Sequence, residues 1–98
     1  MLIRFVRMTF KEEEVENFLL IFESSKHNIK NFPGCNHLEL FQDYHNPAIF
    51  STYSTWENDE YLDNYRNSEL FKKVWKKTKV LFAESPVAYS QKKHTLVD

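Results

Sequence analysis

Small and reactive residues are scarce in this sequence. It has one glycine and one cysteine in 98 residues. A single glycine excludes the glycine-rich phosphate-binding loop and the dinucleotide-binding fingerprint, because both need several glycines close together. A single cysteine excludes an internal disulfide, and neither Cys35 nor the four histidines show the spacing of metal ligands. We therefore expect no metal site.

Strong charge and long apolar segments are also missing. The formal net charge is −1, so the chain as a whole has no field that would select nucleic acid or an anionic membrane. No apolar run approaches the roughly 20 residues that span a bilayer. No apolar segment with a cleavage site follows Met1. We expect a cytoplasmic protein with no nucleic-acid partner and no membrane partner.

Aromatic residues, by contrast, are abundant, at 16% of the chain. A chain of this length forms one domain. It buries roughly 60–70% of its unfolded surface, so its core is adequate but not generous. The rings must be buried somewhere, and a core, a ligand pocket and a subunit interface are the three alternatives.

The clearest structural signal lies between residues 31 and 56. Pro33-Gly34 marks a chain reversal, because proline fixes φ and glycine accepts positive φ. Residues 35–43 mix apolar and polar positions without helical spacing, and residues 48–56 are rich in residue types that suit a pleated surface. These patterns predict two strands joined by the loop 44–47.

The flanking segments predict further strands and helices. Thr9 and Glu12 fit a capping box that would begin the first helix. Asn67-Ser68 either interrupts or re-caps the later helical segment. The predicted elements are a strand at 2–10, an amphipathic helix at 12–31, a helical segment at 58–82 and a short strand at 87–90.

The predicted order of elements is therefore β-α-β-β-α-β. This is the ferredoxin-like α+β pattern, a four-stranded antiparallel sheet with two helices on one face. We expect one domain over residues 1–91 and a polar C-terminal tail over residues 92–98. Because the first strand is apolar on both faces, we expect a homodimer in which two sheets face each other to form a barrel-like core.

Four short segments follow one another at characteristic spacings. They are Phe32-Pro33-Gly34-Cys35, His37-Leu38-Glu39-Leu40, Tyr53 through Trp56-Glu57, and Ser68-x-x-Phe71. Together with the order of elements, they resemble the antibiotic biosynthesis monooxygenase (ABM) domain family of the dimeric α+β barrel superfamily. The resemblance covers about residues 1–91. It implies the same homodimer and a pocket between the sheet and the helices of each subunit.

The resemblance also implies a chemistry. Family members include quinol and aromatic-polyketide monooxygenases that use no metal, flavin or haem, in which the electron-rich substrate passes an electron to dioxygen. Other members degrade haem, but this chain has Val6, Tyr65 and Trp75 where they have an asparagine, a tryptophan and an axial histidine. Without that histidine iron has no proximal ligand there. We expect no haem and no other cofactor.

Seven residues are candidates for the site. Tyr65 stands at a family site position, where a hydroxyl can replace an imidazole as a hydrogen-bond donor. Arg4 shares a strand face with Val6, and a buried arginine needs a partner or an anionic ligand. The alternatives are plain packing for Tyr53 and Trp56 and a surface position for His37. The predicted site has His37 and Tyr65 as catalytic residues and Arg4, Val6, Tyr53, Trp56 and Trp75 as substrate-binding residues.

Two functions compete. The first is a cofactor-independent monooxygenase acting on a small aromatic or quinol-like substrate, in which Arg4 or His37 assists deprotonation or binds an oxyanion. The second is a non-catalytic dimeric module that binds a small hydrophobic ligand. Trp56 favours the first, because it matches the family motif. Tyr65 and Leu70 favour the second, because many family members carry histidines at these positions.

Overall fold

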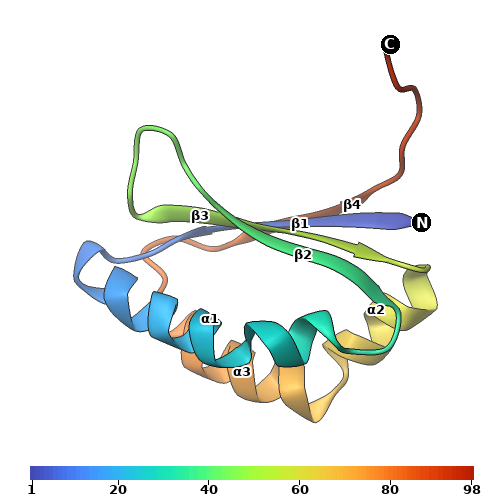
Figure 1. The fold of residues 1–98 in the computed structure, drawn as a ribbon. Helices are drawn as coiled ribbons and strands as arrows, with labels where there is room; N and C mark the ends of the chain where they lie inside the picture. Colours follow the sequence, from blue (N-terminus) through green and yellow to red (C-terminus); the bar gives the residue numbers. More distant parts are fainter.

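The computed structural model describes residues 1–98 as one antiparallel sheet with all helices on one of its faces (Figure 1). The strand order in the sheet is β2-β3-β1-β4. This arrangement confirms the predicted ferredoxin-like α+β fold. The elements are β1 (Leu2–Thr9), the short 3-10 helix η1 (Glu12–Glu14), α1 (Val15–Lys30), β2 (Cys35–Gln42), β3 (Ile49–Trp56), α2 (Asp59–Arg66), α3 (Glu69–Lys79) and β4 (Val87–Gln91).

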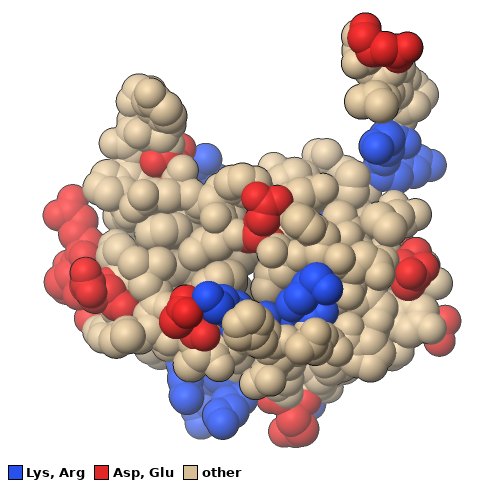
Figure 2. All heavy atoms as spheres, in the orientation of Figure 1, with Lys and Arg blue, Asp and Glu red and all other residues tan.

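The start of α1 differs from the prediction. Thr9 stays in β1, and the residue that precedes η1 is Lys11, whose backbone is extended and whose side chain makes no capping hydrogen bond. The capping-box prediction is therefore wrong. The three glutamates of η1 lie at the beginning of the helix, where the dipole favours negative charge. Figure 2 shows acidic atoms gathered at this end of the molecule.

Ser68 separates the two helices that follow the hairpin. Its hydroxyl donates to the carbonyl oxygen of Tyr65 at 2.6 Å and accepts from the backbone N–H of Phe71 at 3.1 Å. The first bond holds the end of α2 and the second caps the first turn of α3. Of the two alternatives for Asn67-Ser68, a break with a new cap is the one that occurs. The break leaves Tyr65 and Phe71 in contact, with ring centroids 5.2 Å apart.

The only glycine of the chain holds the turn before β2. Gly34 has φ +89°, a conformation that side chains with a Cβ rarely adopt. A Cβ built on Gly34 would lie 2.4 Å from the Cβ of Tyr61 in α2. The carbonyl oxygen of Gly34 also accepts a hydrogen bond from the backbone N–H of Glu57 at 2.9 Å. The predicted Pro33-Gly34 turn is confirmed, and it lets α2 pack closely against the start of β2.

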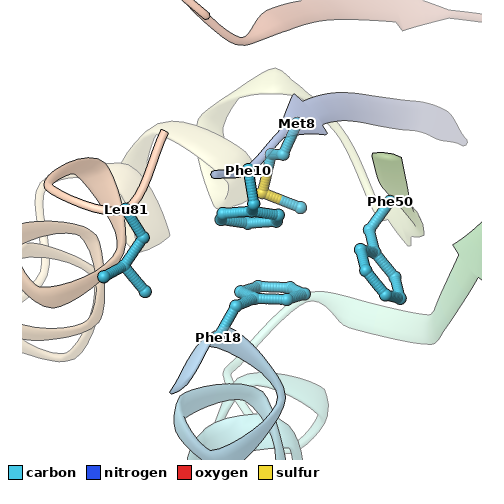
Figure 3. Close-up of a cluster of buried hydrophobic side chains, with 5 residues drawn as sticks. All are labelled: Met8, Phe10, Phe18, Phe50 and Leu81. Atoms are coloured by element: carbon cyan, nitrogen blue, oxygen red, sulfur yellow. The ribbon is translucent and has the colours of Figure 1, made fainter. Parts of the chain in front are cut away.

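The strands present alternate residues to the two faces of the sheet. On β1, Arg4 pairs in register with Ser54 of β3 and Ser90 of β4, so these positions share the face toward the helices. The core lies at one end of this face, where the Phe10 ring stacks on Phe18 with centroids 4.1 Å apart (Figure 3). The buried cluster consists of Met8, Phe10, Phe18, Phe50 and Leu81.

The end of the chain carries no regular structure. β4 ends at Gln91, and residues 92–98 are exposed and belong to neither a helix nor a strand. In Figure 1 this tail rises from the sheet on the side away from the helices. None of the helices has the length and apolar character that a bilayer-spanning helix needs.

Candidate functional site

A cavity of about 320 Å³ lies between the sheet and the helices. Fourteen of its 21 lining residues are hydrophobic. Of all the lining residues only Arg66 of α2 and Ala88 of β4 are exposed. The mouth of the cavity therefore lies between α2 and the edge strand β4. Apolar lining residues from the sheet and from each helix include Val6, Phe18, Ile29, Leu38, Leu62 and Val74.

Most polar groups of the lining already have partners within the chain. The Ser25 hydroxyl donates to the carbonyl oxygen of Ile21 at 2.7 Å, and the Thr78 hydroxyl donates to that of Val74 at 2.8 Å. The indole N–H of Trp56 donates to the Ser54 hydroxyl oxygen at 3.0 Å. These bonds stabilise the cavity wall. They leave Arg4, Tyr65 and Arg66 as the large side chains with donors to offer a ligand.

Arg4 extends from the middle of the sheet into this cavity. Its guanidinium donates one hydrogen bond to the Ser90 hydroxyl at 3.0 Å, which fixes the orientation of the group. Burial lowers the pKa of Arg4, the positive charge of Arg66 lowers it further, and Asp63 raises it. An arginine stays protonated despite such shifts. Arg4 thus brings a positive charge and free donors to a mostly apolar cavity.

Tyr65 forms part of the aromatic wall. Its ring stacks on Trp56 with centroids 5.0 Å apart and an interplanar angle of 26°. Burial raises the pKa of the Tyr65 phenol well above its ordinary value of about 10, and the negative charge of the Cys35 thiolate would raise it further. Every fully buried polar side-chain atom has a hydrogen-bond partner, so the unbonded Tyr65 hydroxyl remains accessible. It is a neutral donor at the cavity.

The structure brings five of the seven predicted site residues together. His37 and Tyr53 do not line the cavity, because they lie on the opposite face of the sheet. Tyr53 is three residues from Trp56, an odd spacing that places the two on different faces of β3. Arg66 is a lining residue that the sequence reasoning missed. The predicted residues that line the cavity are Arg4, Val6, Trp56, Tyr65 and Trp75.

The face of the sheet away from the helices, which we call the open face, carries its own aromatic rings. The Tyr53 ring stacks on Phe5 at 5.3 Å and on Phe41 at 6.2 Å. Phe5 in turn stacks on Tyr89 at 5.6 Å. His37 lies beside Tyr53, and its Nε2 is hydrogen-bonded to Glu39 Oε1 over 2.6 Å. One continuous row of rings therefore crosses all four strands.

The cavity offers hydrogen-bond donors to a ligand but no side chain that could act as a general base. Its lining contains no histidine, cysteine, lysine or carboxylate. No group of three or more histidine, cysteine, aspartate or glutamate side chains is arranged to hold a metal ion. Cys35 lies nearby and is buried, and burial raises the pKa of its thiol. The cavity can bind an apolar ring system and donate hydrogen bonds to an oxygen, but no lining side chain accepts a proton readily at neutral pH.

Comparison with solved structures shows the same fold. A crystal structure of an antibiotic biosynthesis monooxygenase is similar over 97% of this chain and 100% of its own, with a TM-score of 0.91 and 18% identity. A conserved protein from Methanosarcina mazei Go1 is similar over 96% of this chain and 94% of its own (TM-score 0.89, 22% identity). A Pseudomonas aeruginosa protein is similar over the same shares of the two chains (TM-score 0.85, 18% identity).

Sequence comparison identifies the family. No curated protein sequence matches this chain. The model of the antibiotic biosynthesis monooxygenase family matches residues 1–77. That match takes in β1 to β3, α1, α2 and most of α3, which supply most of the cavity lining. The chain belongs to the antibiotic biosynthesis monooxygenase (ABM) family.

Proposed function

We propose that this protein is a monooxygenase that oxidises a small aromatic or quinol-like substrate in the cavity between sheet and helices. The observation that carries the proposal is an apolar cavity, in a member of this family, whose free polar groups are hydrogen-bond donors. The substrate supplies the electrons to dioxygen and the protein supplies no cofactor.

The size and shape of the cavity fit such a substrate. An apolar protein cavity of about 150 Å³ holds benzene, so about 320 Å³ is enough for a compound of two or three fused rings. Phe71 and Trp75 stack on each other with centroids 5.7 Å apart and an interplanar angle of 11°. Tyr65 contacts Phe71 and stacks on Trp56, so the four rings form one continuous aromatic part of the lining. An aromatic lining of this kind favours a planar ligand.

The reaction can be written for an anthrone. Loss of a proton from its ring CH2 group gives an aromatic oxyanion, which passes one electron to dioxygen. The two radicals combine to a peroxide anion, which takes up a proton to give a hydroperoxide. The hydroperoxide loses water and leaves a carbonyl group. One oxygen atom enters the product and the other leaves as water. In this proposal Tyr65 donates a hydrogen bond to the substrate oxygen, and Arg4 stabilises the oxyanion. His37 lies on the open face and does not reach the cavity. Of the two residues expected to assist deprotonation or bind an oxyanion, only Arg4 can therefore do so in this proposal.

We propose further that the protein acts as a homodimer in which the open faces of two copies meet. The row of rings on this face includes Phe41 and Tyr89, which are 46% and 44% exposed in the single chain. Exposed apolar area of this kind marks an interaction surface. In Figure 2 a broad trough separates two projections above the sheet, which Figure 1 identifies as the β2–β3 loop and the C-terminal tail. A second sheet of the same shape would bury the rings.

One observation favours a second function, that of a non-catalytic dimeric module binding a small hydrophobic ligand. The cavity has no residue that accepts a proton near neutral pH. At the positions where many family members carry histidines, this chain has Tyr65 and Leu70. Such a cavity binds its ligand without activating it.

Oxygen consumption with a panel of quinols and anthrones, in metal-free buffer, separates the two functions. We expect uptake above the rate without protein for at least one compound. Ala88→Trp should reduce that uptake at least about tenfold, because it fills the mouth of the cavity. Ala83→Trp is the matched control, since Ala83 is exposed and lies outside the lining. Tyr65→Phe and Trp56→Phe test whether these two lining residues contribute to the oxygen uptake. If no compound gives uptake above the background rate, only the binding module remains.

A further inference from the structure

We propose that the ligand of this cavity carries an anionic oxygen group, a carboxylate or an ionised phenol, which Arg4 and Arg66 bind together at the mouth. The inference deepens the proposed function and rests on the same cavity as the ligand site. It adds a charge requirement and a residue, Arg66, that family membership does not supply.

Two guanidinium groups reach the cavity from different elements. Arg4 belongs to β1 and Arg66 is the last residue of α2, and both line the same space. They are close enough for the charge of Arg66 to act on Arg4. Two like charges that line one space repel each other, and an anion between them relieves this repulsion.

No carboxylate of the chain neutralises either group. The ion pairs of the protein join Arg7 to Asp43, Lys26 to Glu23 and Lys72 to Glu69, and Glu39 is hydrogen-bonded to His37. Asp63 acts on Arg4 from a distance, but it is exposed and forms an ion pair with neither arginine. Tyr65 is neutral, for the reason given above. The mouth of the cavity therefore keeps a net positive charge.

The rest of the cavity determines what kind of anion fits. Behind the two arginines the lining is apolar and aromatic, and it has room for more than one ring. A small inorganic ion would leave this surface unfilled. An aromatic oxyanion would fill it and place its charge between the guanidinium groups. Guanidinium groups match the geometry of a carboxylate with two parallel hydrogen bonds. Ser90 occupies only one of the donors of Arg4.

This requirement also explains how the reaction proceeds without a base in the lining. A positive charge close to a phenol or an enol favours its ionised form and lowers its pKa. The proton leaves to solvent through the mouth, where Arg66 and Ala88 are exposed. The electron-rich oxyanion then remains in the cavity. The two arginines thus replace a general base.

Isothermal titration calorimetry with matched probes tests the inference. We expect 2-naphthoate to bind at least about tenfold more tightly than the neutral 2-naphthamide. Arg66→Gln should remove most of this preference, and because Arg66 is exposed the variant should fold. Arg4→Gln should act in the same direction. Lys73→Gln is the matched control, since it removes one positive charge from an exposed position of α3 outside the lining.

A second probe separates the two sources of negative charge. Bound 2-naphthol should show the absorbance of naphtholate at a pH well below the pKa of free 2-naphthol, and this shift should be lost in Arg66→Gln. A preference for 2-naphthoate with no such shift assigns the site to carboxylates. Equal affinity for 2-naphthoate and 2-naphthamide, with no shift in bound 2-naphthol, overturns the inference.

The outcome is distinguishable from that of the proposed function. If no quinol or anthrone gives oxygen uptake but 2-naphthoate binds more tightly than 2-naphthamide, the anion site is supported and the proposed catalysis is contradicted. If oxygen uptake occurs while 2-naphthoate and 2-naphthamide bind equally, the proposed catalysis is supported and the anion site is contradicted.

Discussion

The two faces of the sheet use aromatic residues in opposite ways. On the helix face, Phe10 and Phe18 seal one end, while Trp56, Tyr65 and Trp75 line a cavity. On the open face the rings stack on one another across the strands and enclose no cavity. The helix face is built around a space for a small molecule. The open face offers a flat, continuous surface that suits a second protein.

The charged and polar side chains of the two faces also differ in whether they have acidic partners within the chain. The helix face holds Arg4 and Arg66 without ion-pair partners. On the open face His37 pairs with Glu39, and Arg7 lies 4.0 Å from Asp43. These polar groups of the open face thus have partners within the chain. On the helix face, Arg4 and Arg66 have no such acidic partners, and we propose that an anionic ligand binds them.

The largest effect is expected at the sealed end of the helix face. Phe10 is 2% exposed and touches three other phenylalanines. Phe10→Ala should lower the free energy of unfolding by about 3–5 kcal/mol, because it leaves a cavity in the core. Urea denaturation measures this. Phe41→Ala on the open face should cost far less for the single chain, since Phe41 is 46% exposed. Equal costs would contradict the distinction between the faces.

The next effect concerns the open face. Tyr53→Glu places a charge in the centre of the row of rings and should weaken dimerisation at least about a hundredfold, because a buried unpaired charge costs several kcal/mol. Sedimentation velocity over a range of concentrations measures the change. Leu20→Glu is the control, since Leu20 lies on α1 and is 67% exposed. A wild-type protein that stays a folded monomer at micromolar concentration would contradict the proposed dimer.

A smaller effect is expected from Tyr65 at alkaline pH. Its pKa is raised in the folded protein, so the fold keeps a proton that the unfolded chain loses above pH of about 10. This contribution to stability is full below that pH and is lost as the pH rises above it. Between pH 9 and 11 the wild type should lose about 1 kcal/mol more than Tyr65→Phe. Denaturation curves at the two pH values measure the difference. Parallel losses would show that folding does not raise the pKa of Tyr65.

The smallest effect concerns the orientation of Arg4. Ser90→Ala removes the hydroxyl that accepts from the Arg4 guanidinium. We expect the affinity for 2-naphthoate to fall about two- to tenfold, the range of one hydrogen bond, while the affinity for 2-naphthamide is unchanged. Calorimetry measures both. An equal loss for the two probes would mean that Ser90 supports the cavity wall and does not orient the charge.

The fold could be predicted from the sequence because its signals are local. The Pro33-Gly34 turn, the strand-forming residues on either side of it and the helical spacing of later apolar residues each report on a few neighbouring positions. The start of α1 was predicted wrongly for the same reason. Thr9 and Glu12 have capping-box spacing, but pairing with Ile49 keeps Thr9 in the sheet.

The site was only partly predictable from the sequence. The position of Tyr53 outside the cavity and the position of Arg66 in its lining could both have been predicted from residue spacing. Tyr53 and Trp56 are three positions apart in a strand, which excludes a common face. Arg66 follows Leu62 by four positions, which places it on the same side of a helix as that buried residue. The openness of the cavity could not be predicted. It depends on Phe71 stacking flat on Trp75 instead of filling the space, and that packing involves the whole fold.

The most direct test of the division between the faces is a crystal structure of the protein with bound 2-naphthoate. We predict the ring system against Trp56 and Trp75 in the cavity, the carboxylate against Arg4 and Arg66, and a second copy of the chain on the open face. A naphthalene ring stacked on Phe5 and Tyr53, with the helix-face cavity unfilled, would contradict the account.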